Sequence, residues 1–101
     1  MNAETFEEKI YDNCETCLVV FSRKTCHVCA EVVPMVTEIS EEYKDKMTFY
    51  YVDVEDERDL YTRFSLRGVP QIMLFADGDF KGKMGGLVEE EALKEKIKEL
   101  L

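Results

Sequence analysis

The sequence is short of basic residues, contains no tryptophan, and has only two prolines and one histidine. Its 13 lysine and arginine residues are outnumbered by 22 acidic residues, so the formal net charge is −9. Because binding to phosphates requires a basic face, we expect no nucleic-acid partner. The acidic balance instead favours solubility and a mild bias toward basic protein partners.

Long apolar runs are also absent, and none approaches the roughly 18 residues that a membrane-spanning helix requires. The acidic start Met1-Asn2-Ala3-Glu4 lacks the basic segment and apolar core of a signal peptide. We therefore expect a cytoplasmic protein with no membrane partner. Repeats, linkers and low-complexity segments are missing too, and 46% of the 101 residues are hydrophobic. Residues 1–101 are expected to form one domain around one core.

Four cysteines are too few to staple a chain with an adequate core, so they indicate catalysis or metal binding. Cys26 and Cys29 form a Cys-x-x-Cys pair between an apolar run at residues 17–21 and a long helical pattern. A strand that feeds a helix through a turn places the first cysteine at the helix N-terminus. Free backbone N–H groups and the macrodipole favour a thiolate there. The pair is therefore interpreted as a redox site.

Short apolar runs and one hairpin signal predict four strands, and apolar residues at helical spacing predict four helices. The strands are expected at residues 17–21, 48–54, 71–76 and 80–84. The helices are expected at residues 5–11, 26–44, around 60–64 and at 89–101. Thr5 and Asp56 are the predicted N-caps of the first and third helices. Asp77-Gly78 is a strong hairpin signal.

The two longer helices are expected to bury one apolar stripe each. These stripes consist of Val32, Val36, Ile39 and Tyr43 in the first, and Leu93, Ile97 and Leu100 in the second. Pro34 lies inside the first of these helices and should kink it, since proline removes one backbone donor.

Several features in register make the chain after residue 5 resemble the thioredoxin family. They are the Cys-x-x-Cys pair, Pro34 eight residues after Cys26, the run Arg67-Gly68-Val69-Pro70, the turn Asp77-Gly78, and Gly86. The resemblance implies an α/β, thioredoxin-like fold with a central mixed sheet of four to five strands, built βαβ then ββα and flanked by helices. The family's first strand should be short or absent, because only four residues precede Thr5.

The resemblance also implies a thiol–disulfide oxidoreductase that reduces or exchanges protein disulfides. Cys26 is expected to attack a substrate disulfide, and Cys29 to resolve the mixed disulfide that results. No cofactor is expected, since the two thiols carry both electrons. The expected partners are disulfide-containing proteins and a reductase that the sequence does not identify. His27 and Val28 are expected to tune the Cys26 thiolate, although His27 could simply be a polar residue at an exposed turn.

Four residues are expected to bind substrate. Thr25 precedes the first cysteine, and Pro70 resembles the family's cis-proline, with an ordinary trans-proline as the alternative. A cis bond would turn the Val69 backbone toward the thiols, where the family pairs it with an extended substrate strand. Gln71 follows directly.

The sequence departs from the family pattern at several site positions. Thr25 stands where a tryptophan is usual, His27-Val28 where Gly-Pro is usual, and Gln71 where threonine is common. Val20 occupies the position of a buried acid, six residues before Cys26, and Tyr51 that of its lysine partner. Because valine cannot accept a proton from a buried Cys29, we expect slower resolution at neutral pH than in relatives.

A metal-binding module is the first alternative function, since Cys14, Cys17, Cys26 and Cys29 could hold zinc or an iron–sulfur cluster. A strand between the pairs would separate them by roughly 15 Å, so no metal is expected. Cys14 and Cys17 could instead form an accessory disulfide or be ordinary thiols, with Cys17 buried.

A thioredoxin-fold interaction domain without turnover is the second alternative. In either case the strand at residues 48–54 could lie at the edge of the sheet if the first strand is missing. Such an edge could provide a dimer contact, so the chain is expected to be a monomer or a weak dimer.

Overall fold

A four-stranded mixed sheet forms the centre of the computed structural model, which describes residues 3–12, 16–64 and 68–101. Its strands are β1 (Cys17–Ser22), β2 (Thr48–Asp53), β3 (Gln71–Ala76) and β4 (Asp79–Gly85), in the order β2-β1-β3-β4. β1 is parallel to β2 and antiparallel to β3, and β4 is antiparallel to β3. The expected mixed sheet is confirmed. Within the described residues no strand precedes β1, which leaves β2 at an edge.

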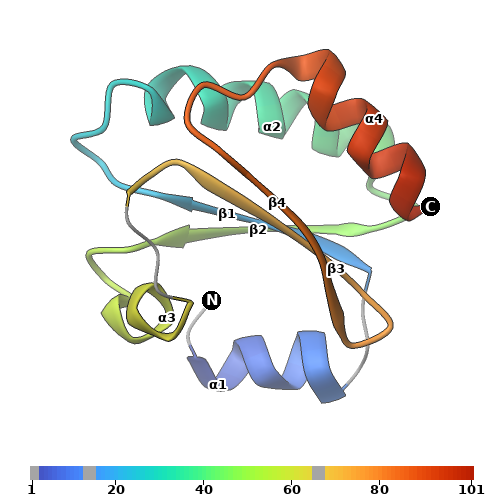
Figure 1. Cartoon of the computed structure of the whole chain (residues 1–101), viewed down its shortest axis with the longest axis horizontal. Coiled ribbons are helices and arrows are strands. Elements are labelled where there is room, and N and C mark those ends of the chain that lie inside the picture. The colour runs from blue at the N-terminus through green and yellow to red at the C-terminus, as the bar shows by residue number, and fades with distance from the viewer. Residues whose placement is uncertain (1–2, 13–15, 65–67) are drawn as a thin grey trace.

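Helices cover both faces of this sheet (Figure 1). They are α1 (Ala3–Phe6), the π-helix η1 (Glu7–Asp12), α2 (Cys29–Tyr43), α3 (Arg58–Arg63) and α4 (Glu90–Leu100). Figure 1 shows α2 and α4 on one face, with α1 and α3 on the other. β1 is therefore buried on both sides, which explains why its residues form a continuous apolar run.

Each face of the sheet has its own apolar core. Leu18 and Val20 of β1 pack toward α2 and α4, together with buried residues of those helices: Val32, Val36, Ile39, Leu93 and Ile97. Cys17, Val19 and Phe21 point to the opposite face, where Phe6 and Leu60 also lie. Tyr43 and Leu100 are only partly buried at the margin of the first core.

Two predicted N-caps are wrong. α1 begins at Ala3, so Thr5 lies inside the helix, because Ala3 and Glu4 are themselves good helix formers. α3 begins at Arg58 with Glu57 before it, because Asp53 rather than Asp56 organises the preceding turn. The Glu55 N–H donates to Asp53 Oδ1 over 2.8 Å, and the Glu57 N–H donates to the Asp53 carbonyl over 2.9 Å.

α2 begins at Cys29, three residues later than predicted. The Ala30 N–H donates to the Cys26 carbonyl as in a helix, but the Glu31 N–H donates to the carbonyl of Val28 instead of that of His27. This irregular turn keeps Cys26 just outside the helix while leaving it at the amino end. Pro34 lies inside the helix, as predicted.

The hairpin between β3 and β4 is confirmed. Asp77 and Gly78 have φ angles of 55° and 81°, as a tight turn with two left-handed residues requires. Ala76 pairs with Asp79 directly across this turn.

Cys14, and Arg67 of the run that ends at Pro70, lie outside the described residues. In the part of the chain that is described, no helix is both long and apolar enough to cross a membrane.

Candidate active site

Cys26 and Cys29 lie where the carboxyl end of β1 turns into α2. The Cys26 N–H donates to the Arg23 carbonyl over 3.2 Å, which closes the turn. The backbone N–H of Cys29 donates to Cys26 Sγ over 3.1 Å. Both cysteines are free thiols; Cys26 is partly exposed and Cys29 is buried. One sulfur is thus reachable from solvent, and the other lies just beneath it.

The pKa of the Cys26 thiol lies below its ordinary value. Partial burial acts to raise this pKa, but hydrogen bonds from the Cys29 thiol and from the backbone N–H groups of Cys29 and Val28 outweigh it. The positive charge of Arg23 lowers it further. The amino end of α2 therefore favours a thiolate at Cys26, as the sequence predicted.

The pKa of the Cys29 thiol is shifted in the opposite direction. Burial raises it most, and the neighbouring Cys26 raises it further through a hydrogen bond and through its charge. The Ser22 hydroxyl and the Arg23 backbone N–H donate hydrogen bonds that partly offset this rise. The two sulfurs therefore differ in pKa and in exposure.

A cis peptide bond joins Val69 to Pro70, as predicted. The Cys26 thiol donates to the Val69 carbonyl over 3.6 Å, so this backbone lies directly against the exposed sulfur. Gln71, the next residue, begins β3 opposite Gly85. Its Oε1 is buried and has no partner among the described residues, and a Cβ on Gly85 would lie 2.9 Å from it.

The other predicted site residues lie around this pair. His27 and Val28 are exposed in the turn between the cysteines. Val28 affects Cys26 through its backbone N–H rather than its side chain. Thr25 is exposed and lines a cavity beside the turn.

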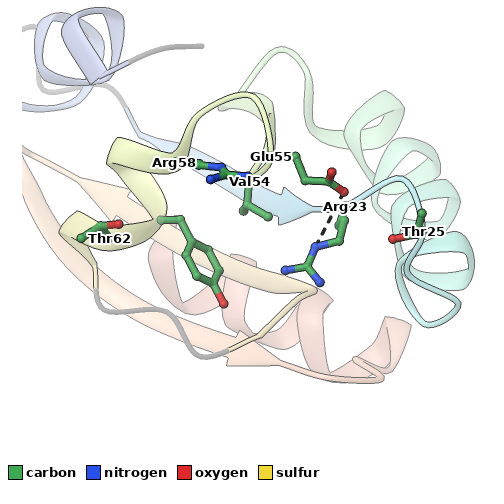
Figure 2. A pocket seen from close by; sticks show the side chains of 7 residues that line it. Arg23, Thr25, Val54, Glu55, Arg58 and Thr62 are labelled. Carbon is green, nitrogen blue, oxygen red and sulfur yellow. Dashed lines mark ion pairs between the residues drawn. The ribbon is translucent and has the colours of Figure 1, made fainter.

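This cavity has a volume of about 470 Å³ and opens between the thiol turn and α3 (Figure 2). Its lining residues are Arg23, Thr25, Val54, Glu55, Arg58, Tyr61 and Thr62. An ion pair between Arg23 Nε and Glu55 Oε1, 3.8 Å apart, joins its two sides. It offers both charge and apolar surface close to Cys26.

A second cavity, of about 250 Å³, lies over the buried sulfur. Its lining residues are Ser22, Arg23, Lys24, Cys26, Cys29, Ala30, Val33, Pro34 and Tyr51. Tyr51, which stands at the family's lysine position, is thus beside the thiol pair, whereas Val20 lies deeper in the core.

Ser22 and Arg23 contact the thiols but were not identified from the sequence. The predicted strand ended at Phe21, so both residues were assigned to the turn, whereas Ser22 is the last residue of β1. Leu18, Val20 and Ser22 alternate along the sequence, so an extended strand places all three side chains on one face. This alternation is the sequence signal that could have identified Ser22.

The four-cysteine metal site does not fit the described geometry. Cys17 begins β1 and packs into the core on the α3 face, whereas Cys26 and Cys29 follow the other end of β1 on the α2 face. Ligands of one zinc ion must all lie within about 2.3 Å of it. Cys17 therefore cannot share a metal with the other two.

Comparisons with known proteins agree with this arrangement. The family model described as Thioredoxin matches residues 1–99. Thioredoxin 1 of Chlorobaculum tepidum is 25% identical over 94% of each chain. The thioredoxin of Rickettsia bellii is 27% identical over 93% of this chain and 90% of the relative. A chloroplastic M-type thioredoxin of Pisum sativum is 24% identical over the whole chain, which spans only 59% of that relative.

Among solved structures, the thioredoxin of Fasciola hepatica superposes with a TM-score of 0.89, covering 99% of this chain and 95% of the other. The two sequences are 24% identical, so this likeness establishes the fold.

Proposed function

This chain belongs to the thioredoxin family, and we propose that it performs the thiol–disulfide exchange that this membership implies, with Cys26 as nucleophile and Cys29 as resolving thiol. The observation that carries the assignment is the 3.1 Å contact between the Cys29 N–H and Cys26 Sγ. A donated N–H favours the thiolate at the exposed sulfur, and only a thiolate attacks a disulfide.

The exchange proceeds in two displacements. The Cys26 thiolate attacks one sulfur of a substrate disulfide, forms a mixed disulfide and releases the other substrate sulfur as a thiolate that takes up a proton. Cys29 then loses its proton and attacks Cys26 Sγ, which forms the Cys26–Cys29 disulfide and releases the second substrate thiolate. The protein leaves this cycle oxidised by two electrons, so a separate reductase must recharge it, and no cofactor is needed.

The substrate chain is proposed to lie against Val69, Pro70 and Gln71. The Val69 carbonyl is 3.6 Å from Cys26 Sγ and can accept an N–H from an extended substrate strand once the thiol is engaged. Gln71 directly follows Pro70 and begins β3, so its backbone continues the surface on which the substrate strand would lie. Thr25 and the cavity of Figure 2 would receive substrate side chains beside the thiol turn.

His27 and Val28 are proposed to tune the thiolate in different ways. Val28 acts through its backbone N–H, which a side-chain substitution leaves in place. His27 would act through its side chain, which is exposed in the turn between the two cysteines. His27→Ala should therefore change the rate of Cys26 alkylation, and a rate equal to that of the wild type would contradict this role.

Reduction of insulin disulfides with dithiothreitol as electron source tests the proposed activity. The chain should accelerate this reaction, and Cys26→Ser or Cys29→Ser should each abolish the acceleration. A wild-type chain that has no effect, together with an unreactive Cys26, would instead support an interaction domain without turnover.

The physiological direction depends on the reduction potential of the Cys26–Cys29 pair. A value near that of thioredoxin, roughly −270 mV, would imply a reductant, and one of about −120 to −180 mV an oxidant or isomerase. Equilibration with glutathione buffers measures it.

We also propose that the chain is a monomer or a weak dimer that pairs through β2. The Thr48 N–H donates to the carbonyl of Thr16, just before β1, and the Val54 N–H donates to the carbonyl of Ser22 at the end of β1. The backbone groups of Phe49 and Tyr51 therefore point away from the sheet. Antiparallel pairing of two copies would bring Lys46 at one end close to Glu55 at the other. Sedimentation equilibrium over a range of concentrations tests this.

A cytoplasmic location is likewise proposed, because reducing compartments keep thiols reduced between turnovers. The relatives include bacterial and chloroplastic proteins, so fractionation of the source cells is the appropriate test.

A further inference from the structure

Ser22 and Asp53 are the two buried polar side chains of the described residues, with exposed fractions of 2% and 7%. They are register partners at the carboxyl ends of β1 and β2. Asp53 has a structural task, since its Oδ1 accepts the Glu55 N–H in the turn before α3. Ser22 takes no part in that turn through its side chain, so its burial requires another explanation.

The position of Ser22 supplies that explanation. Leu18 and Val20 pack against the helices on the α2 face, and strand alternation places Ser22 on the same face, one step closer to the thiols. Ser22 also lines the cavity of about 250 Å³ that both Cys26 and Cys29 border. The Ser22 hydroxyl thus lies in the cavity lining next to the buried Cys29 sulfur.

We propose that Ser22 is a positioning residue for the resolving step, whose hydroxyl holds the Cys29 sulfur and donates a hydrogen bond to it as it becomes a thiolate. This inference rests on the proposed function and adds a residue to it. Val20 leaves the site without a carboxylate, and the hydroxyl at the next inward-facing position provides a neutral donor in its place. A neutral donor can be buried without the cost of a buried charge.

The proton balance of this step is as follows. The Cys29 thiol gives its proton to water in the cavity, and the Ser22 hydroxyl keeps its own proton throughout. The thiolate attacks Cys26 Sγ, the Cys26–substrate bond breaks, and the departing substrate thiolate takes a proton from solvent. Ser22 therefore lowers the energy of the charged sulfur without acting as a base.

The test must separate the effect of the Ser22 hydroxyl from the effects of the other groups around Cys29. The Arg23 backbone N–H is a second donor to the Cys29 sulfur, and it persists in any Ser22 variant. The titratable or charged side chains that line the cavity are Arg23, Lys24, Cys26 and Tyr51. Loss of the Ser22 hydroxyl alters none of them, so its effect can be measured against a constant background.

The test is the pH dependence of the decay of a preformed mixed disulfide between Cys26 and a small thiol. In Ser22→Ala the midpoint of this profile should rise by about one pH unit, since a hydrogen bond to a charged group contributes about that much to an equilibrium. Ser22→Thr retains a hydroxyl and should restore the wild-type midpoint. Ser40→Ala is the matched control: its hydroxyl bonds the Thr37 carbonyl within α2, and the midpoint should not move.

A second readout does not depend on turnover. In a Cys26→Ala background, the rate of Cys29 alkylation, followed by mass spectrometry, should also shift to higher pH when Ser22→Ala is added. Unchanged midpoints in both assays would overturn the proposal. It would also be overturned if Asp53→Asn, rather than Ser22→Ala, moved the profile, because a carboxylate would then be the active group. Failure of the proposed function itself would look different, since no mixed disulfide would form at Cys26.

Discussion

At the scale of single residues, the site depends on two thiols whose pKa values are shifted in opposite directions. The pKa of Cys26 is lowered by hydrogen bonds from Cys29 and Val28, against the effect of its own partial burial. The pKa of Cys29 is raised, mainly by burial. As pH rises, the Cys26 thiolate therefore forms first, and Cys29 ionises only at higher pH.

This order predicts the outcome of alkylation. Iodoacetamide near pH 6 should label Cys26 well before Cys29, and Cys29 labelling should appear only at alkaline pH. Peptide mass mapping measures both. In unfolded protein the two cysteines should react alike, which controls for intrinsic reactivity. Preferential labelling of Cys29 in the folded chain would reverse the roles assigned to the two residues.

The second prediction concerns Val20 and the rate at which Cys29 resolves the mixed disulfide. Val20 is buried in the core on the α2 face of the sheet. It stands at the position where the family places a carboxylate that takes the proton of the resolving thiol. Val20→Asp should speed the decay of the mixed disulfide at pH 7, by as much as about 100-fold if the new carboxylate acts as a general base. It should also destabilise the fold by about 2 kcal/mol or more, because the carboxylate lacks a partner.

Val20→Asn separates these two effects. It introduces a polar group of similar size that cannot accept a proton, so it should destabilise the chain without faster resolution. The account of this position would be wrong if wild type already resolved fast at pH 6 and Val20→Asp changed nothing.

The remaining cysteines give a third prediction. Cys17 is buried on the face of the sheet opposite the thiol pair, so Cys14 and Cys17 are not expected to take part in exchange. Cys14→Ser should leave the rate of insulin reduction nearly unchanged. Loss of activity in this variant would reopen the accessory disulfide as a functional element.

At the scale of elements, strands were predicted better than helix starts. The β3–β4 hairpin was predictable because Asp77-Gly78 encodes its own turn locally. The start of α3 was not, because Asp53 at the end of β2 organises that turn.

In the site, Cys26, Cys29 and the cis Val69–Pro70 bond could be predicted from sequence motifs. Ser22 was missed because the predicted strand ended at Phe21. The alternation of Leu18, Val20 and Ser22 indicates the face on which Ser22 lies, but not that its side chain is buried there.

The hairpin allows a prediction with a matched pair of glycines. Gly78 has a φ of 81°, and Gly78→Ala should cost about 1 kcal/mol of unfolding free energy because an L side chain disfavours this conformation. Gly82 lies in β4, and a Cβ there would lie 3.9 Å from Leu74 Cδ1, an ordinary contact. Gly82→Ala should therefore be neutral or slightly stabilising. Urea unfolding of the two variants measures the difference, and equal losses would contradict the assigned turn.

At the scale of the whole molecule, β1 connects the two apolar cores to the thiol site. Its alternating side chains enter both cores, and its carboxyl end carries Ser22 and leads into the thiol turn. We propose that the chain folds as one domain. Urea unfolding followed by tyrosine fluorescence and by far-ultraviolet circular dichroism should give coincident single transitions. Two separate transitions would indicate that the two faces of the sheet unfold independently.

The central claim is that Cys26 attacks and Cys29 resolves, and trapping tests it most directly. Cys29→Ser should accumulate a mixed disulfide with an oxidised protein substrate, because the resolving thiol is gone. Mass mapping of the trapped complex should place the substrate on Cys26, and adding Cys26→Ser should prevent its formation. A substrate attached to Cys14 or Cys17, or no trapped complex from a folded Cys29→Ser variant, would contradict the account.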